Sequence, residues 1–305
     1  MGNSTLIRPG SAEWLRYMSP SKAAAVYGVS RWESARSLWH RMRGELPPED
    51  PKDIFAVGHA YEPTIRELWK LDNPGWRLSH GEVQVNAGDR FGFPLVATVD
   101  GRASKGRARK VVEKKTARKL EEWGDDFTEA GAPMDYVVQV WVQQLVTGWT
   151  KEPADLTVMG PYFKHHTYRI AFDADVATDI ADELGKFYRR LKDPDAAPEL
   201  DDHVATYECI RAMHPDIDDT RRVTLDTDLG LEYLDAVLEF RDVEKRLRGL
   251  KTRVLDAMGD AKHADIVTGE GADGPVLERV AYRKPGRGGA VSLNPISEKA
   301  MEALV

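Results

Sequence analysis

The residues in this sequence best suited to chemistry are two acids and a lysine in its first half. Asp100 ends the apolar run PLVATVD, and Glu113 and Lys115 belong to the run ARKVVEKKTA. In a β-strand, residues two positions apart point to the same side, so Glu113 and Lys115 share a face, and Asp100 can meet them from the preceding strand. The sequence therefore predicts that these three side chains converge.

Two carboxylates and an ammonium group are suited to phosphodiester hydrolysis with a divalent cation. Carboxylate oxygens are ligands that Mg²⁺ prefers, and the ion usually keeps waters and takes phosphate oxygens as further ligands. Such an ion lowers the pKa of a bound water, and a lysine beside it can orient or deprotonate that water. The alternative is a surface ladder of salt bridges, because acid-x-Lys triplets are common in charged proteins.

The charge distribution supports a local contact with phosphate rather than a DNA-coating protein. The formal net charge is -7, but the segment from Arg102 to Lys119 has nine Lys or Arg residues and one acid, Glu113. Phosphate binding depends on such clusters of basic residues. A solvated basic hairpin is the alternative explanation of the same charges.

The order of expected elements predicts an α/β domain with a mixed, twisted sheet flanked by helices. Ser19 and Pro20 suit the N-cap and first residue of a helix, and Pro63 leaves open a bend in a later one. Residues 82–117 have the composition of strands joined by turns, which predicts a β-meander. The other expected helices cover 31–44, 53–71, 134–147 and 176–191, a loop covers 46–53, and further strands cover 154–160 and 165–172.

The composition becomes polar and rich in proline near residue 200, which predicts a first domain over 1–200 and an extension over 201–305. Apolar residues at helical spacing from Leu231 to Met258 predict a long amphipathic helix in this extension. Residues 263–269 and 275–284 suit a β-hairpin, and 285–294 suits a glycine-rich loop.

Cysteine usage and hydropathy limit the class of protein further. Cys209 is the only cysteine, so the chain can form neither an intrachain disulfide nor a four-cysteine iron–sulfur or zinc site. The N-terminal residues lack a secretory pattern, and no stretch reaches about 18 consecutive apolar residues. We therefore expect a soluble, cytoplasmic protein with no membrane association.

Five motifs between approximately residues 14 and 192 resemble, in the same order, those of the YqaJ and λ-exonuclease-like phage alkaline exonucleases, a branch of the PD-(D/E)XK nuclease superfamily. They are SPSKAAAVYGVSRWESARSLW, GHAYEP, ATVDG, VVEKKTA and YVVQVWVQQLVTG. The resemblance implies a PD-(D/E)XK core, restriction-endonuclease-like in fold, with residues 201–305 as a helical and small β appendage.

The resemblance also implies roles for individual residues of the catalytic centre. Asp100 and Glu113 would bind metal together with the backbone carbonyl of Lys114, and Glu62 would support a second metal ion or its waters. Lys115 would act on the nucleophile. Gln139 would hold water or Lys115 by hydrogen bonds.

Two residues near the N-terminus match those that contact the terminal 5′-phosphate of DNA in that family. They are Arg16 and Ser21, although the segment between them is shorter than in λ exonuclease. A helix start offers hydroxyls and free N–H groups to an anion. Ordinary helix capping is the alternative role for Ser21.

The activity implied by the resemblance is Mg²⁺-dependent digestion of double-stranded DNA from 5′ ends, with Mn²⁺ as a substitute. It would leave 3′ single strands for a single-strand annealing recombinase and aid phage-type homologous recombination. A ring-shaped homo-oligomer, trimeric in λ exonuclease, would make digestion processive. The alternatives are a PD-(D/E)XK endonuclease and a non-catalytic DNA-end-binding or assembly protein on a nuclease scaffold.

Overall fold

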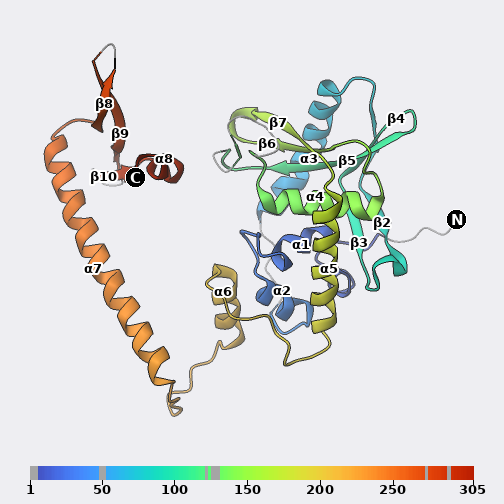
Figure 1. The fold of residues 1–305 in the computed structure, drawn as a ribbon, viewed down its shortest axis with the longest axis horizontal. Coiled ribbons are helices and arrows are strands. Elements are labelled where there is room, and N and C mark those ends of the chain that lie inside the picture. The colour runs from blue at the N-terminus through green and yellow to red at the C-terminus, as the bar shows by residue number, and fades with distance from the viewer. Residues whose placement is uncertain (1–5, 48–52, 121–122, 125–130, 272–273, 287–289) are drawn as a thin grey trace. The chain divides into compact units, whose positions relative to one another are not determined.

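The computed structural model describes residues 6–47, 53–120, 123–124, 131–271, 274–286 and 290–305. The chain divides into two compact units, residues 1–217 and 218–305, and Figure 1 shows the elements of each. The predicted loop over 46–53 lies mostly outside the described residues. Within them, no helix is long and apolar enough to cross a membrane.

Unit 1 is built on a five-stranded mixed sheet with the order β1-β4-β5-β6-β7. Only β5 and β6 run parallel, and the other neighbours are antiparallel. The helix α4 (Met134–Thr147) connects the parallel pair, as a crossover must. The strands are β1 (Arg77–Leu78), β4 (Gly101–Lys105), β5 (Ala108–Thr116), β6 (Ala154–Met159) and β7 (His165–Ile170).

Helices cover both faces of this sheet, which confirms the predicted α/β class. Val112 of β5 packs with Trp69 of α3 (Asp53–Asp72), whereas its neighbour Val111 packs in a cluster with Val140 of α4. Because successive strand residues point to opposite faces, α3 and α4 lie on opposite sides of β5. The helix α3 continues through Pro63, where the sequence left a bend open.

The segment expected to form one β-meander forms two sheets. Strands β2 (Val83–Asn86) and β3 (Val96–Val99) pair with each other, and the 3-10 helix η2 (Gly88–Phe91) connects them. The following strands, β4 and β5, join the central sheet. The chain changes sheets at Asp100, and at Gly101 a Cβ atom would come within 2.6 Å of the Leu78 side chain. A glycine at this position therefore permits the close approach of β1 and β4.

Four helices and strand β3 enclose the second apolar core of unit 1. They are the helices α1 (Pro20–Val26), α2 (Ala35–Met42), α4 and α5 (Ala174–Arg190). Met18, Leu38 and Leu184 are among the fully buried residues of this core. One face of α4 packs in this core, and another face packs against the central strands. The core therefore determines which residues of α4 face β5.

Unit 1 ends after Ile217, beyond the predicted boundary near residue 200, because α6 (Val204–Met213) stays attached to the N-terminal helices. The Thr206 hydroxyl donates to Ser34 Oγ at 2.6 Å, and His203 Nε2 lies 3.0 Å from the carbonyl oxygen of Ser30. These contacts hold α6 near the start of α2.

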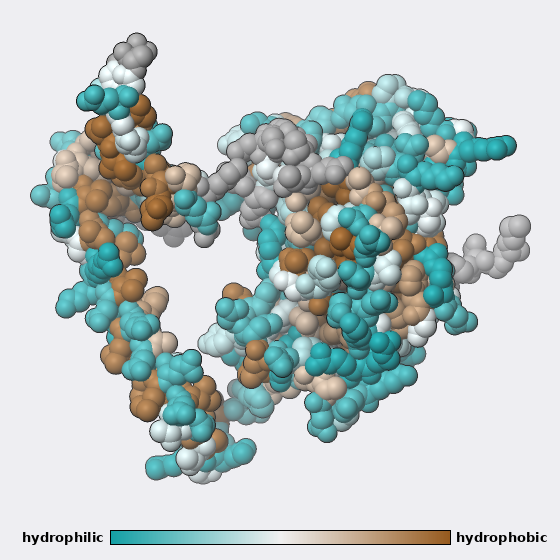
Figure 2. Space-filling view, viewed as in Figure 1, coloured by the Kyte–Doolittle hydropathy of each residue, from teal (hydrophilic) through white to brown (hydrophobic). Residues whose placement is uncertain are grey.

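Unit 2 contains the predicted long helix and hairpin. The helix is α7 (Thr227–Met258), and β8 (His263–Gly271) pairs antiparallel with β9 (Gly274–Pro285). Apolar side chains along α7 are exposed (Figure 2). The prediction of a loop over 285–294 is wrong in part, because β10 (Val291–Pro295) pairs with β9 as a third strand. The glycines that precede β10 favoured a loop and gave no sign of this pairing. The short helix α8 (Glu298–Leu304) follows.

Candidate active site

Asp100 lies directly before β4, and Glu113 lies on the neighbouring strand β5. Gly101 pairs with Val112, so the next step along the antiparallel ladder places Asp100 opposite Glu113. The backbone N–H of Lys114 donates to Asp100 Oδ2 at 2.7 Å. The change of sheets after Val99 therefore brings the first acid against the strand that carries the second.

Two carboxylates in this partly buried place oppose each other's ionisation. Burial, followed by the charge of Glu113, raises the pKa of Asp100 to about 8, against the opposing effect of the Lys115 and Lys114 charges. Only 2% of the surface of Glu113 is exposed. A positive charge between the two acids would relieve this repulsion.

Lys115 shares the face of Glu113, as the alternation of strand residues predicts. Its Nζ atom lies 2.6 Å from Glu113 Oε1 and 5.0 Å from the centre of the Tyr136 ring. Burial alone would lower the pKa of Lys115, but the charges of Glu113 and Asp100 outweigh it and hold that pKa above its usual range. The lysine is therefore charged at neutral pH in the absence of a metal ion.

Two glutamines of α4 reach the same carboxylate from the other side. Gln139 Nε2 donates to Glu113 Oε1 at 2.6 Å. Gln143 Nε2 donates to Glu113 Oε2 at 2.7 Å and to the carbonyl oxygen of Thr98 at 3.3 Å. Residues four apart lie on one helix face, so the spacing from Gln139 was the signal that could have found Gln143, which sequence reasoning missed.

Glu62 lies on the opposite face of β5. It accepts from Lys114 Nζ at 3.1 Å, and Lys114 points toward α3 because its neighbours Glu113 and Lys115 point toward α4. Among the described residues, no direct contact joins Glu62 to either acid of the ladder. The role predicted for Glu62 beside a second metal ion stays a prediction.

Arg16 and Ser21 lie in a separate N-terminal segment. Arg16 ends the 3-10 helix η1 (Trp14–Arg16), and Ser21 is the second residue of α1; both are exposed. The Ser21 hydroxyl lies 3.1 Å from that of Ser19. In the part of the chain that the structure describes, neither Arg16 nor Ser21 contacts Asp100 or Glu113, so a shared site with the acids stays untested.

The neighbouring lysine of this segment is buried. Lys22 Nζ donates to the carbonyl oxygens of Trp14 at 2.9 Å and Tyr17 at 2.5 Å, and lies 3.7 Å from the centre of the Trp14 ring. Burial, followed by the charge of Arg41, lowers the pKa of Lys22 to about 7. The buried Lys22 side chain therefore connects η1 to α1 and is not available to a ligand in solvent.

The donor set at Asp100 and Glu113 fits a hard divalent cation. Within the described residues, no three His, Cys, Asp or Glu side chains form a metal-binding cluster. The ligand set that the family resemblance implies, two carboxylates and the Lys114 carbonyl, stays a prediction. Mg²⁺ accepts such a partial set because it retains several waters. Burial, followed by the charge of Glu113, raises the pKa of Asp100, and a bound cation would offset both effects.

An acid directly after one strand and a Glu-x-Lys triplet on a later one, in a mixed sheet flanked by helices, agree with the PD-(D/E)XK arrangement that the sequence resemblance predicts. Residues 11–150 match the family described as YqaJ-like viral recombinase domain. The match includes Asp100, Glu113, Lys115 and both glutamines of α4.

Solved structures give more distant similarities. An alkaline exonuclease (LHK-Exo) from Laribacter hongkongensis is 19% identical, covering 60% of this chain and 93% of that chain, with a TM-score of 0.46. The structure of LHK-Exo in complex with dAMP is 20% identical, covering 59% of this chain and 90% of that chain, with a TM-score of 0.44. No curated protein matches the chain. Similarities this distant assign no activity to it.

Proposed function

We propose that unit 1 is a divalent-metal-dependent nuclease that hydrolyses phosphodiester bonds of DNA. The observation that carries this proposal is that Asp100 accepts a hydrogen bond from the Lys114 N–H at 2.7 Å, next to Glu113, whose Oε1 lies 2.6 Å from Lys115 Nζ. The YqaJ family match supports it, because that family is described by its role in recombination. Phosphate chemistry needs little from a protein beyond positioned charges of this kind.

Asp100, Glu113 and the carbonyl of Lys114 would hold Mg²⁺, with Mn²⁺ as a substitute. When bound, the ion lowers the pKa of a coordinated water and offsets charge on the phosphate oxygens. Lys115 orients the attacking water and stabilises negative charge on the phosphate. Gln139 and Gln143 hold the Glu113 carboxylate in a single orientation, as partners of metal-binding side chains commonly do.

The substrate of this nuclease is double-stranded DNA, digested from ends in the 5′ to 3′ direction. The 3′ single strands that remain suit a single-strand annealing recombinase. Arg16 and Ser21 would bind the terminal 5′-phosphate, and a ring-shaped homo-oligomer would keep the enzyme on its substrate. The exposed basic residues of the β4–β5 hairpin, such as Arg102 and Arg107, support contact with a DNA backbone.

One experiment tests the reaction, its direction and its dependence on ends. Linear duplex labelled separately at its 5′ and 3′ termini and closed circular duplex are incubated with Mg²⁺, or with EDTA. We expect loss of the 5′ label first, no cleavage of the circle, and no reaction in EDTA. Cleavage of the circle would indicate an endonuclease instead.

The matched variants for this experiment are Lys115→Ala and Lys251→Ala. Lys115 contacts Glu113, whereas Lys251 is an exposed lysine of α7 in unit 2. We expect Lys115→Ala to abolish hydrolysis and Lys251→Ala to retain it. Full activity in Lys115→Ala, or none in the wild-type protein, would remove the proposal and favour a non-catalytic DNA-end-binding protein.

A further inference from the structure

The connection between β6 and β7 exposes two aromatic side chains. Tyr162 is 91% and Phe163 is 80% exposed, and both belong to the 3-10 helix η4 (Pro161–Phe163). Their φ angles are 58° and 61°. This left-handed conformation is unfavourable for bulky residues and is found mainly where the surrounding structure maintains it, often at functional sites.

The neighbouring strand holds this loop in place. The Ala117 N–H donates to the Met159 carbonyl oxygen at 2.9 Å, which continues the β5–β6 pairing past Thr116. Within the loop, the Gly160 N–H donates to the Lys164 carbonyl oxygen at 2.8 Å. The two rings are therefore presented to solvent by a closed turn attached to the end of β5.

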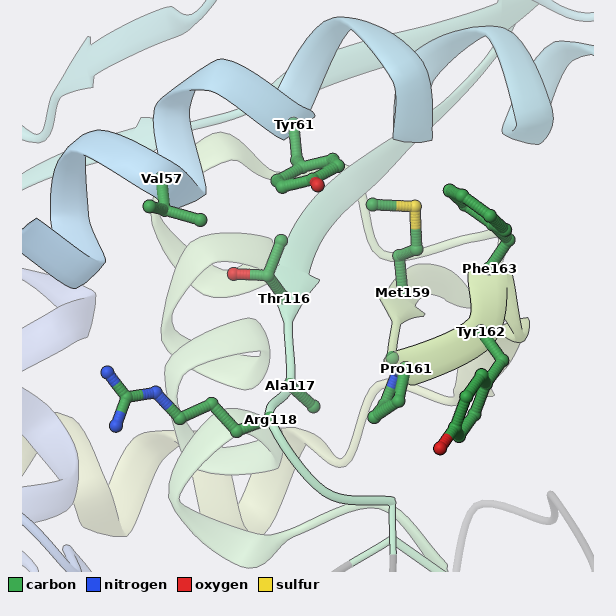
Figure 3. A pocket seen from close by; sticks show the side chains of 10 residues that line it. Val57, Tyr61, Thr116, Ala117, Arg118, Met159, Pro161, Tyr162 and Phe163 are labelled. Carbon is green, nitrogen blue, oxygen red and sulfur yellow. The ribbon is translucent and has the colours of Figure 1, made fainter.

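A pocket of about 540 Å³ lies beside these rings, between α3 and the end of β5 (Figure 3). Its volume falls in the range of about 300 to 1,000 Å³ that is typical of small-ligand sites. Tyr61 of α3 and Met159 of β6 line it together with Thr116 and Arg118. Among the residues that the structure describes, none that lines the pocket is acidic.

The pocket adjoins the candidate active site along two elements. Thr116 follows Lys115 on β5, and Tyr61 precedes Glu62 on α3. Thr116 points to the α3 face of β5, whereas Glu113 and Lys115 point to the α4 face. Strand β5 ends at Thr116. A nucleic acid strand that occupied both the pocket and the candidate active site would pass over this end of β5.

We propose that this pocket binds unpaired bases of the DNA strand next to the bond that is cleaved. The rings of Tyr162, Phe163 and Tyr61 stack on the bases, and the positive charge of Arg118 contacts the phosphates between them. Every base presents a flat face to an aromatic ring, so such a site tolerates any sequence. The site rests on the proposed nuclease function and adds to it a place where separated strands are held.

Charge and chemistry favour a nucleic acid strand over an apolar partner. Exposed Lys119 and Lys164 flank the pocket in sequence, next to Arg118 and Phe163. Aromatic faces bordered by basic groups are the usual construction of single-strand binding sites.

The test measures binding to a short single-stranded oligonucleotide that carries 2-aminopurine, whose fluorescence falls when the base stacks on a ring. The full chain is used in EDTA, so that hydrolysis does not interfere. The variant is Tyr162→Asn with Phe163→Asn, because asparagine tolerates the left-handed backbone and removes the rings. Phe240→Ala is the control, since Phe240 is an exposed ring of α7 in unit 2.

We expect the double variant to lose the fluorescence quench and to bind the oligonucleotide at least about fivefold more weakly, since one stacked base contributes roughly 5- to 150-fold. Phe240→Ala should bind like the wild-type protein, and Phe163→Trp should retain the quench. Equal binding and quench in the double variant would overturn the proposal. So would a change in oligomeric state without a change in quench, which would assign the rings to an interface between copies.

The two proposals fail in distinguishable ways. If the wild-type protein hydrolyses linear duplex with Mg²⁺ while the double variant binds the oligonucleotide unchanged, the pocket proposal fails alone. If the wild-type protein shows ring-dependent quenching but no hydrolysis with Mg²⁺ or Mn²⁺, the nuclease proposal fails, and the pocket remains a single-strand binding site.

Discussion

Two regions of unit 1 are candidate DNA contacts: Asp100 and Glu113, which we call the ladder acids, and the N-terminal segment from Trp14 to Lys22. They are constructed differently. Glu113 is held by Gln139 and Gln143 from a helix that follows it in the chain, and Asp100 is held by the backbone of Lys114. In the N-terminal segment from Trp14 to Lys22, the side-chain hydrogen bonds stay within a few residues. The tertiary fold determines the first site, and local helix geometry determines the second.

This difference has energetic consequences. A buried carboxylate such as Glu113 is costly unless donors satisfy it, so its surroundings must keep their arrangement for the fold to tolerate it. Ser21 is exposed and carries no such requirement. We therefore expect substitutions at the ladder acids and their partners to have large effects, and those at the N-terminal segment to have small effects that depend on the substrate.

The largest expected effect follows from neutralising Asp100. Asp100→Asn removes one of two carboxylates that would hold the metal ion, and we expect hydrolysis of linear duplex to fall by at least about 100-fold. The thermal unfolding temperature should not fall, because the substitution removes a charge whose burial and repulsion by Glu113 both raise the pKa of Asp100. Initial rates and thermal melts of the same preparations measure both quantities.

Asp89→Asn is the matched control, since Asp89 is an exposed aspartate of η2. It should leave rate and melting temperature unchanged. A rate for Asp100→Asn close to that of the wild-type protein would show that the ladder acids are structural, and the contrast with the N-terminal segment would lose its functional meaning.

The second effect separates two adjacent glutamines of α4. Gln143 is fully buried and holds Glu113, whereas neither amide atom of the buried Gln144 has a hydrogen-bond partner within the described residues. We expect Gln143→Leu to lower the turnover number by about 10- to 100-fold, in line with losses of other groups that orient metal ligands. Gln144→Leu should retain activity.

The free energy of unfolding should separate the same pair in the same sense. Gln143→Leu removes a donor from a buried carboxylate and should cost about 1 to 3 kcal/mol of unfolding free energy. Gln144→Leu replaces an amide that lacks partners and should be neutral or stabilising. Urea titration of both variants measures this. Equal loss of activity in both would mean that the helix, and not the Glu113 contact, accounts for the effect.

The sequence was sufficient to predict the ladder site because two simple regularities define it. Alternation along β5 places Glu113 and Lys115 on one face, and the apolar run before Asp100 marks the end of a strand. The family resemblance then added Gln139 on a helix of the predicted length. Gln143 lies one helical turn after Gln139 and could have been found from that spacing. No other pattern in the sequence of α4 distinguishes it.

Other features depend on tertiary contacts that no local pattern reports. The expected meander divides into two sheets, and the strand that begins at Gly101 packs closely against Leu78 of β1, a partner from outside the meander. Strand β10 follows a glycine-rich segment, so local propensity favoured a loop, and pairing with β9 decided the outcome. The left-handed backbone at Tyr162 and Phe163 is contrary to residue preference and is observable only in the folded chain.

The smallest expected effect concerns Ser21 and the end of the substrate. Ser21→Ala should slow digestion of 5′-phosphorylated linear duplex by about 2- to 10-fold, the amount that one hydrogen bond of modest strength contributes. The same variant should digest 5′-hydroxyl duplex at the wild-type rate, because the missing contact has no phosphate to bind. Ser292→Ala, an exposed serine of β10 in unit 2, is the control.

The rates of the wild-type protein and of Ser21→Ala on the two substrates form a double-mutant cycle. The coupling between loss of the hydroxyl and loss of the phosphate decides whether Ser21 contacts the phosphate. A hydroxyl that contacts the phosphate makes the effects of the two removals less than additive, because either removal alone already eliminates the contact. Additive effects would return Ser21 to the role of a helix-start residue beside Ser19. The 5′ preference would then have to come from Arg16 or from another part of unit 1.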